Sequence, residues 1–214
     1  MKASELFEKN IGRCDALVKV HRLTQGKGRQ VAHGELADIL RAIIVFAVAG
    51  MDSYFHKKIV EVVGVVIRSK NIIPEKCAYV IASQFKDAVR SKELLNIAVS
   101  KSAENKILKL LEKGLAPLTF QKPDKLTDAF NIMGTKDPWR KINLRMSRGR
   151  GKGKAGRFID SRKFIKQFTD RRDDIVHEGD MYLSKKHHSK LKFIKRSGVE
   201  DLIKKLKRLI EAVE

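Results

Sequence analysis

Residues 36–51 read Leu-Ala-Asp-Ile-Leu-Arg-Ala-Ile-Ile-Val-Phe-Ala-Val-Ala-Gly-Met and contain the longest apolar run of this 214-residue chain. On a helix with about 3.6 residues per turn, these apolar side chains point in nearly every direction. The helical pattern extends from Glu35 to about Arg68, so we predict a long helix in the middle of a bundle. Gly50 costs about 1 kcal/mol in helix propensity, and we expect it to let another helix approach closely.

Helical patterns flank this central helix on both sides. Apolar residues recur every three or four positions over residues 4–23, 158–178 and 198–214, and shorter helices are indicated within residues 75–113 and 126–133. We find no alternation of apolar and polar residues bounded by hairpin turns. The sequence therefore predicts an all-α fold, an up-and-down helical bundle in one domain. Its core helices lie at about 36–69 and 157–180, with an inserted helical segment at about 71–156 and a C-terminal helix at about 198–214.

The formal net charge of +21 is the strongest compositional feature. So many uncompensated cations oppose compaction unless a polyanion or solvent screens them, which makes nucleic acid the default partner. Of the 46 Lys and Arg residues, 24 lie from Lys136 onward. A membrane surface or an acidic protein attracts the same charge, and solubility explains part of it.

The cysteines and the apolar runs of the sequence indicate the cellular location of the protein. Cys14 and Cys77 lie far apart, without Cys-x-x-Cys spacing or a zinc-type Cys/His cluster. The first residues lack the apolar core of a signal peptide, and the run from Ala42 to Met51 is too short to span a bilayer. We expect a cytoplasmic protein that binds no membrane and needs no metal or cofactor.

A second informative stretch, residues 169–180, reads Thr-Asp-Arg-Arg-Asp-Asp-Ile-Val-His-Glu-Gly-Asp and ends a helical pattern at Gly179. Within it, His177 can accept and donate a proton near neutral pH, and the guanidinium of Arg172 can bind phosphate oxygens with two hydrogen bonds. This combination suits RNA cleavage, in which a 2′-hydroxyl loses a proton, a leaving oxygen gains one and an anionic phosphorus is stabilised. That chemistry requires no metal.

Helical geometry qualifies this interpretation. Arg172 and His177 are five positions apart, about 140° around a helix, whereas Asp173 and His177 are four apart and share a face. Asp173 is therefore a candidate to orient the imidazole, and Arg172 can instead meet a histidine of a second copy. The alternative is a solvated helix end with an Arg-Asp pair and a histidine near the negative end of the helix dipole.

Two stretches resemble a known family. Residues 172–177 resemble the Arg-x4-6-His signature of HEPN domains, in which a polar residue follows the arginine. Residues 40–54 resemble the first core helix of the RiboL-PSP group of this superfamily, where a carboxylate precedes an aromatic by two residues, as Asp52 precedes Tyr54. The resemblance covers about residues 36–69 and 157–180. It implies an all-helical homodimer with two facing Arg-x4-His helices and metal-independent endoribonuclease activity, although some members only bind RNA or protein.

Basic residues before this helix are candidates for RNA contacts. We expect the glycine-rich loop at 147–157 to make sequence-independent phosphate contacts, although a disordered linker fits the composition equally well. The spacing of its glycines is not that of a P-loop. The candidate nucleic-acid-binding residues are Arg171, Arg148, Arg150, Lys152, Lys154 and Arg157.

Another titratable pair lies on the central helix. Asp52 and His56 are four positions apart on one face. They are candidates for a second acid-base pair that supports the catalytic residues, although a surface pair at the rim of a cleft fits the spacing as well.

The sequence therefore predicts a metal-independent endoribonuclease of the HEPN type, acting on RNA as a homodimer. His177 is the expected acid-base group, Arg172 the phosphate ligand with Arg171 in reserve, and Asp173 the residue that orients His177. One alternative is a non-catalytic nucleic-acid-binding module with the same bundle and charge. The other is a protein-interaction subunit, such as a toxin-antitoxin or defence-system component with an antitoxin or other partner protein.

Overall fold

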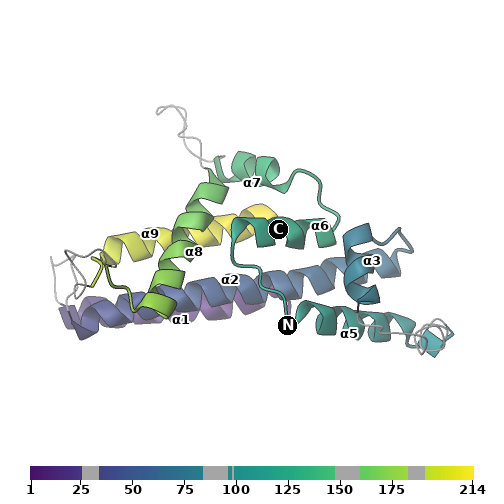
Figure 1. Cartoon of the computed structure of the whole chain (residues 1–214), viewed down its shortest axis with the longest axis horizontal. Helices are drawn as coiled ribbons and strands as arrows, with labels where there is room; N and C mark the ends of the chain where they lie inside the picture. Colours follow the sequence, from purple (N-terminus) through teal and green to yellow (C-terminus); the bar gives the residue numbers. More distant parts are fainter. Residues whose placement is uncertain (26–33, 84–95, 98, 148–159, 183–190) are drawn as a thin grey trace. The chain divides into compact units, whose positions relative to one another are not determined.

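The computed structural model describes residues 1–25, 34–83, 96–97, 99–147, 160–182 and 191–214. Over these ranges the regular elements are helices, accompanied by one isolated antiparallel bridge between Met181 and Leu191 (Figure 1). The predicted all-α class is therefore confirmed for the part of the chain that the structure describes. None of the helices in these ranges is long and apolar enough to cross a bilayer.

The described helices form two compact units. The first unit comprises Met1–Ala3 and Asp52–Pro138, and the second comprises Ser4–Met51 and Trp139–Glu214. The division falls inside α2 (Glu35–Arg68), the helix predicted from residues 36–51. The segment predicted as an insertion, 71–156, contributes to both units.

In the first unit, the second half of α2 is accompanied by three shorter helices, α3 (Glu75–Ala82), α5 (Ala103–Leu115) and α6 (Pro123–Ile132). Helix α3 packs against both α5 and α6. Phe55 of α2 lies edge-on to Phe130 of α6, with their ring centroids 5.5 Å apart. Buried aromatic contacts of this kind hold short helices that would be marginal on their own.

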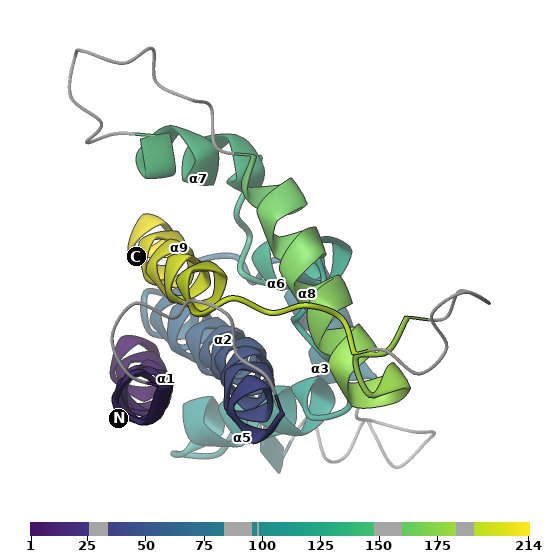
Figure 2. The same cartoon turned by 90° about the vertical axis from the view of Figure 1, so that its left-hand side faces the viewer.

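The second unit contains α1 (Ala3–Gln25, from Ser4 onward), the first half of α2, most of α7 (Pro138–Ser147), α8 (Ser161–Glu178) and α9 (Arg196–Val213). Helices α1, α2 and α9 run alongside one another and appear nearly end-on in Figure 2, where α8 crosses them obliquely. At Gly50, an added Cβ would lie 3.0 Å from the Cβ of Asn10 on α1. The expected close helix approach at Gly50 is therefore confirmed.

Helix α7 is the one described helix of the second unit that the sequence did not predict as a helix. Its residues Trp139 and Ile142 are buried. The amide oxygen of Asn143 accepts hydrogen bonds from the backbone N–H and the hydroxyl of Ser161, at 3.0 and 2.5 Å. Arg145 donates to the carbonyl of Ala212 at 2.7 Å. The ten residues of α7 are thus held by the ends of α8 and α9.

Three buried side chains in the core have unusual titration behaviour. Burial raises the pKa of the thiols of Cys14 and Cys77 to about 11, so both stay protonated. His21 is fully buried on α1, and neither ring nitrogen has a hydrogen-bond partner among the described residues. Burial and then the nearby Arg196 guanidinium lower the pKa of His21 below its ordinary value of 6.5, despite the opposing effect of Glu200.

We predict that the protein loses stability in acid through His21. Because the folded-state pKa lies below the unfolded-state value, the unfolded chain binds more protons as the pH falls through 6.5, and the free energy of unfolding decreases. Urea unfolding of the wild type between pH 7.5 and 5.5 measures this loss. His21→Phe should flatten the pH dependence, whereas the control His56→Gln should retain it; equal slopes for wild type and His21→Phe would contradict the assignment.

Candidate functional site at the end of helix α8

Helix α8 carries the predicted catalytic residues, and both of its ends are defined by local chemistry. At its start, the carboxylate of Asp160 accepts a hydrogen bond from the backbone N–H of Lys163, a typical N-cap. At its end, Gly179 adopts a left-handed conformation with φ of 62°. Asp180 follows with φ of 59°, a conformation that is uncommon for residues other than glycine. The backbone N–H of Asp180 donates to the carbonyl of Asp174 at 2.9 Å, which turns the chain sharply after the helix.

This turn delivers Asp180 into a buried cluster of charges. Its carboxylate is fully buried, and Oδ2 accepts hydrogen bonds from Nε of Arg41 at 2.6 Å and from Nη2 of Arg171 at 2.8 Å. Arg41 comes from α2 and is itself buried. A buried carboxylate with two guanidinium partners is compensated for the loss of its hydration, so Asp180 ties α8 to α2.

The same two arginines fix the segment that precedes α9. Nη2 of Arg41 donates to the carbonyl of Lys192 at 3.0 Å, and Nη2 of Arg171 donates to the carbonyl of Phe193 at 3.2 Å. The backbone N–H of Lys192 donates to the carbonyl of Asp180 at 2.6 Å. The ammonium of Lys192 pairs with Asp174 at 2.6 Å. We call Arg41, Arg171, Asp180 and Lys192 the arginine-aspartate anchor.

Arg171 therefore has a structural task that the sequence did not indicate. It was predicted to bind RNA and to stand in reserve for Arg172, yet its guanidinium is bound to Asp180 and to backbone carbonyls. If the guanidinium of Arg171 moved away to bind a phosphate, the buried carboxylate of Asp180 would lose one of its two positive partners, at a large cost in free energy.

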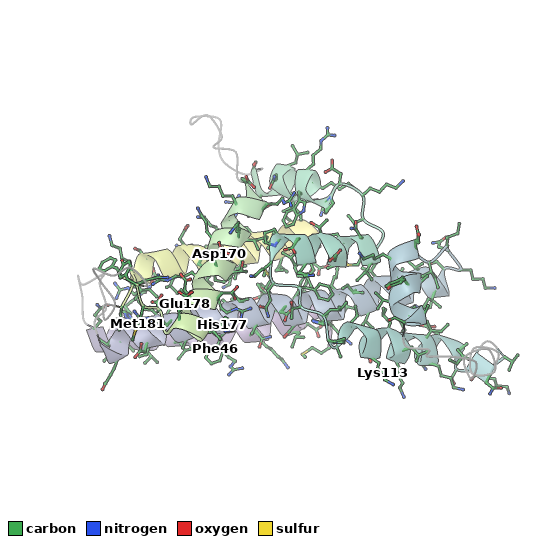
Figure 3. All side chains as sticks on the ribbon, viewed as in Figure 1. Phe46, Lys113, Asp170, His177, Glu178 and Met181 are labelled. Atoms are coloured by element: carbon green, nitrogen blue, oxygen red, sulfur yellow. The ribbon has the colours of Figure 1, made fainter. Side chains whose placement is uncertain are left out.

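The predicted catalytic residues lie on the remaining surface of α8. Nη1 of Arg172 is 3.2 Å from Oδ1 of Asp173, and both side chains are mostly buried. His177 is exposed on the last turn of the helix, near Glu178 and Met181 in Figure 3. Asp173 and His177 are one helical turn apart, whereas Arg172 and His177 point in directions about 140° apart.

This arrangement offers an ionic pair and an exposed imidazole on one helix. The partial burial of Arg172 and its pairing with Asp173 hold the guanidinium in a defined direction. On one copy of the helix, the arginine and the histidine therefore point in different directions.

Asp52 and His56 belong to the first unit, and both hold the chain before α6. The carboxylate of Asp52 accepts hydrogen bonds from the backbone N–H of Phe120 at 2.5 Å and the side-chain amide of Gln121 at 3.0 Å. Nε2 of His56 is 3.2 Å from the carbonyl of Leu118 and 3.7 Å from Asp52. Asp52 and His56 thus hold residues 118–121 in place within the first unit.

The predicted basic loop lies outside the described residues. This applies to Arg148, Arg150, Lys152, Lys154 and Arg157. Within the described ranges, no group of three or more His, Cys, Asp or Glu side chains is placed so that it could hold a metal ion.

The arginine-aspartate anchor was not predicted from the sequence, although two features of the sequence point to it. Arg41 is the one cation of the predominantly apolar stretch 36–51, and a charge inside a buried helix requires a buried partner. Asp180 directly follows Gly179, the residue that ends α8, and a left-handed turn at such a glycine directs the chain back toward the helix. Neither signal identifies the other residue, because 139 positions separate them.

No protein-family model, curated protein or solved structure matches this chain.

We predict that Asp180→Asn destabilises the protein by about 3–5 kcal/mol, because it leaves the guanidinium groups of Arg41 and Arg171 without their buried counter-charge. Chemical denaturation measures the change in the free energy of unfolding. The matched control is Asp38→Asn, since Asp38 also pairs with Arg41, at 3.0 Å, but its side chain is 69% exposed. Asp38→Asn should lower the free energy of unfolding by less than about 1 kcal/mol. Equal decreases for the two variants would show that burial of the Asp180 carboxylate does not strengthen its contribution to stability.

Proposed function

We propose that this protein is a metal-independent endoribonuclease of the HEPN type that acts as a homodimer. The observation that carries the proposal is the end of α8, where Arg172 is paired with Asp173 at 3.2 Å and His177 is exposed on the last turn of the same helix. The all-helical structure of the described residues and the net charge of +21 support it. RNA is the polyanion that carries the 2′-hydroxyl on which this chemistry depends.

The proposed reaction uses the 2′-hydroxyl of the substrate as the nucleophile. His177 removes the proton from this hydroxyl as its oxygen attacks phosphorus, and the bond from phosphorus to the 5′-oxygen of the next nucleotide breaks. The imidazolium of His177 formed in this way then gives its proton to that leaving oxygen. The products are a 2′,3′-cyclic phosphate and a 5′-hydroxyl end, so atoms and charges balance without an oxidant or a metal.

Arg172 and Asp173 have distinct tasks in this scheme. The guanidinium of Arg172 stabilises the negative charge that accumulates on the phosphate oxygens in the transition state. Asp173, one turn before His177, orients the imidazole. The pairing with Asp173 also keeps Arg172 in one direction before the substrate binds.

The directions of the two side chains support a homodimer. Since Arg172 and His177 diverge on one helix, each proposed site takes its arginine from one subunit and a histidine from the other. Exposed apolar side chains near the end of α8 are available for such an interface: Val176, Met181 and Tyr182.

We predict metal-free cleavage that depends on both residues. In EDTA, the purified protein should cut a structured RNA pool, and His177→Ala should lower the rate by about 10²–10⁴-fold because acid-base catalysis is lost. Arg172→Ala should lower the rate by about 10²-fold or more while RNA binding persists. Gel analysis of end-labelled RNA measures both rates, with His56→Gln and the exposed Arg140→Ala as matched controls.

The ends of the products test the proposed chemistry separately. Fragments with 2′,3′-cyclic phosphate and 5′-hydroxyl ends are expected, and fragments with only 3′-hydroxyl ends would remove the 2′-hydroxyl mechanism. Cleavage that is unchanged in both variants would remove this site.

We predict that two inactive variants complement each other. In a mixed dimer of Arg172→Ala and His177→Ala, one site carries both substitutions and the other carries neither. Co-refolding equal amounts of the two variants should therefore restore about a quarter of the wild-type rate, since about half of the dimers are mixed and each has one intact site. No restored activity in demonstrably mixed dimers would place the arginine and the histidine of each site in the same subunit.

A second candidate function rests on the charge alone. The net charge of +21 suits a protein that binds RNA without cutting it. In that case, binding would weaken steeply with salt and survive His177→Ala, and the intact protein would show no cleavage.

A further inference from the structure

The other side of α8 borders a cavity of about 280 Å³ that lies wholly within the second unit. Phe168 and His177 are nine positions apart on α8, so their side chains point in roughly opposite directions. The cavity therefore lies on a face distinct from that of Asp173 and His177. Its main lining residues are Phe164, Gln167, Phe168, Phe193, Lys195 and Lys205.

Two phenylalanine rings that line this cavity each have a lysine ammonium over them. The rings of Phe164 and Phe168 are stacked, with centroids 6.2 Å apart and planes 5° from parallel. The ammonium of Lys205 lies 5.4 Å from the ring centre of Phe164, and that of Lys195 lies 5.5 Å from the ring centre of Phe193. Flat apolar surfaces with positive charges close to them suit a flat ring that carries an anionic group.

Phe193 is the feature that most needs an explanation. Its side chain is 54% exposed, although it is large and apolar, while the neighbouring Ile194 is buried. The backbone at this point is held firmly, because Arg171 donates to the carbonyl of Phe193 at 3.2 Å and Arg41 donates to the carbonyl of Lys192 at 3.0 Å. The arginine-aspartate anchor thus presents an exposed aromatic ring on a fixed backbone, which reduces the entropy lost when a ligand stacks on it.

The size and charge of the cavity restrict its occupant. At about 280 Å³ it lies at the lower limit of the range of about 300–1,000 Å³ for small-molecule sites, which suits a single ring system. The acidic residue in its lining, Asp201, is paired with Lys205 at 2.6 Å, so the lining as a whole is cationic. Gln167 adds an amide that can donate to and accept from a base edge.

We propose that this cavity binds one unpaired nucleotide of a single-stranded RNA, with its base stacked on the exposed ring of Phe193 and its phosphate held by Lys195. This inference rests on the proposed function, since it takes RNA as the ligand, and it adds a binding subsite away from the scissile phosphate. Because Phe193 lies at the cavity, on the side of α8 away from His177, its loss weakens RNA binding and raises KM without lowering kcat.

The test is RNA binding by full-length Phe193→Ala, measured from the fluorescence anisotropy of a labelled single-stranded oligonucleotide at fixed salt. Loss of one stacked base should weaken binding about tenfold. The matched control is Tyr79→Ala, because Tyr79 is a 72% exposed aromatic residue of the first unit and its removal should leave binding unchanged. Both residues are exposed, so neither variant should fail to fold.

A second variant reports stacking directly. Phe193→Trp should bind the oligonucleotide as the wild type does, and its added fluorescence should be quenched by the normal oligonucleotide but not by an abasic one of equal length. Binding of Phe193→Ala within twofold of the wild type, or equal quenching by the abasic strand, would overturn the proposal. Saturation by adenosine monophosphate at a lower concentration than by the oligonucleotide would also overturn it, by making a free nucleotide the occupant.

The outcomes separate this subsite from the proposed nuclease. A wild-type protein that binds no RNA at low salt would remove both. RNA cleavage that depends on His177, with normal binding by Phe193→Ala, would remove the subsite alone. Binding that depends on Phe193, without any cleavage, would support the subsite and remove the catalytic proposal.

Discussion

The second unit depends on one fully buried carboxylate. Asp180 is placed between the guanidinium groups of Arg41 and Arg171, at 2.6 and 2.8 Å, while its other oxygen has no hydrogen-bond partner among the described residues. Burying these charges is costly, and the cost is offset only when all of them are in place. The interaction is therefore close to all-or-none, and it joins α2, α8 and the segment before α9 through residues that are distant in sequence.

This constraint organises the two faces of α8 differently. Arg171 faces the anchor and fixes the backbone at Phe193, so it cannot also serve as a freely moving phosphate ligand. Arg172, the next residue, points about 100° away around the helix and pairs with Asp173. The doubled arginine thus has two tasks, one in folding and one that we propose for catalysis. An arginine pair that looks redundant in the sequence is not redundant in the structure.

The high positive charge is also used in more than one way. Arg41, Arg171 and Lys192 are bound to acidic side chains in or beside the anchor, where they stabilise the fold. Lys195 lies over the ring of Phe193 at the cavity, where it can meet an anionic ligand. Net charge alone therefore indicates the class of partner, whereas the positions of individual cations distinguish folding contacts from the surfaces we propose for RNA.

The sequence by itself determined the helical class and the positions of most helices. The all-round apolar run at 36–51 requires a buried helix, and α2 has the predicted bounds from Glu35 to Arg68. Gly179 predicted the end of α8, because a left-handed residue there favours glycine. These features depend on local periodicity and backbone conformation, which a sequence displays directly. Arg172, Asp173 and His177 were also found from spacing, and their catalytic role stays a prediction.

Only the tertiary structure decided which polar residues meet. It paired Arg41 with Asp180, gave Asp52 the backbone N–H of Phe120, and assembled α7 from contacts with Ser161 and Ala212. It also brought Phe193 beside α8, where no periodic pattern links the two. The physical reason is that such pairings join residues far apart in the chain, and their partners are selected by the burial of charge and the satisfaction of hydrogen bonds after the helices have packed.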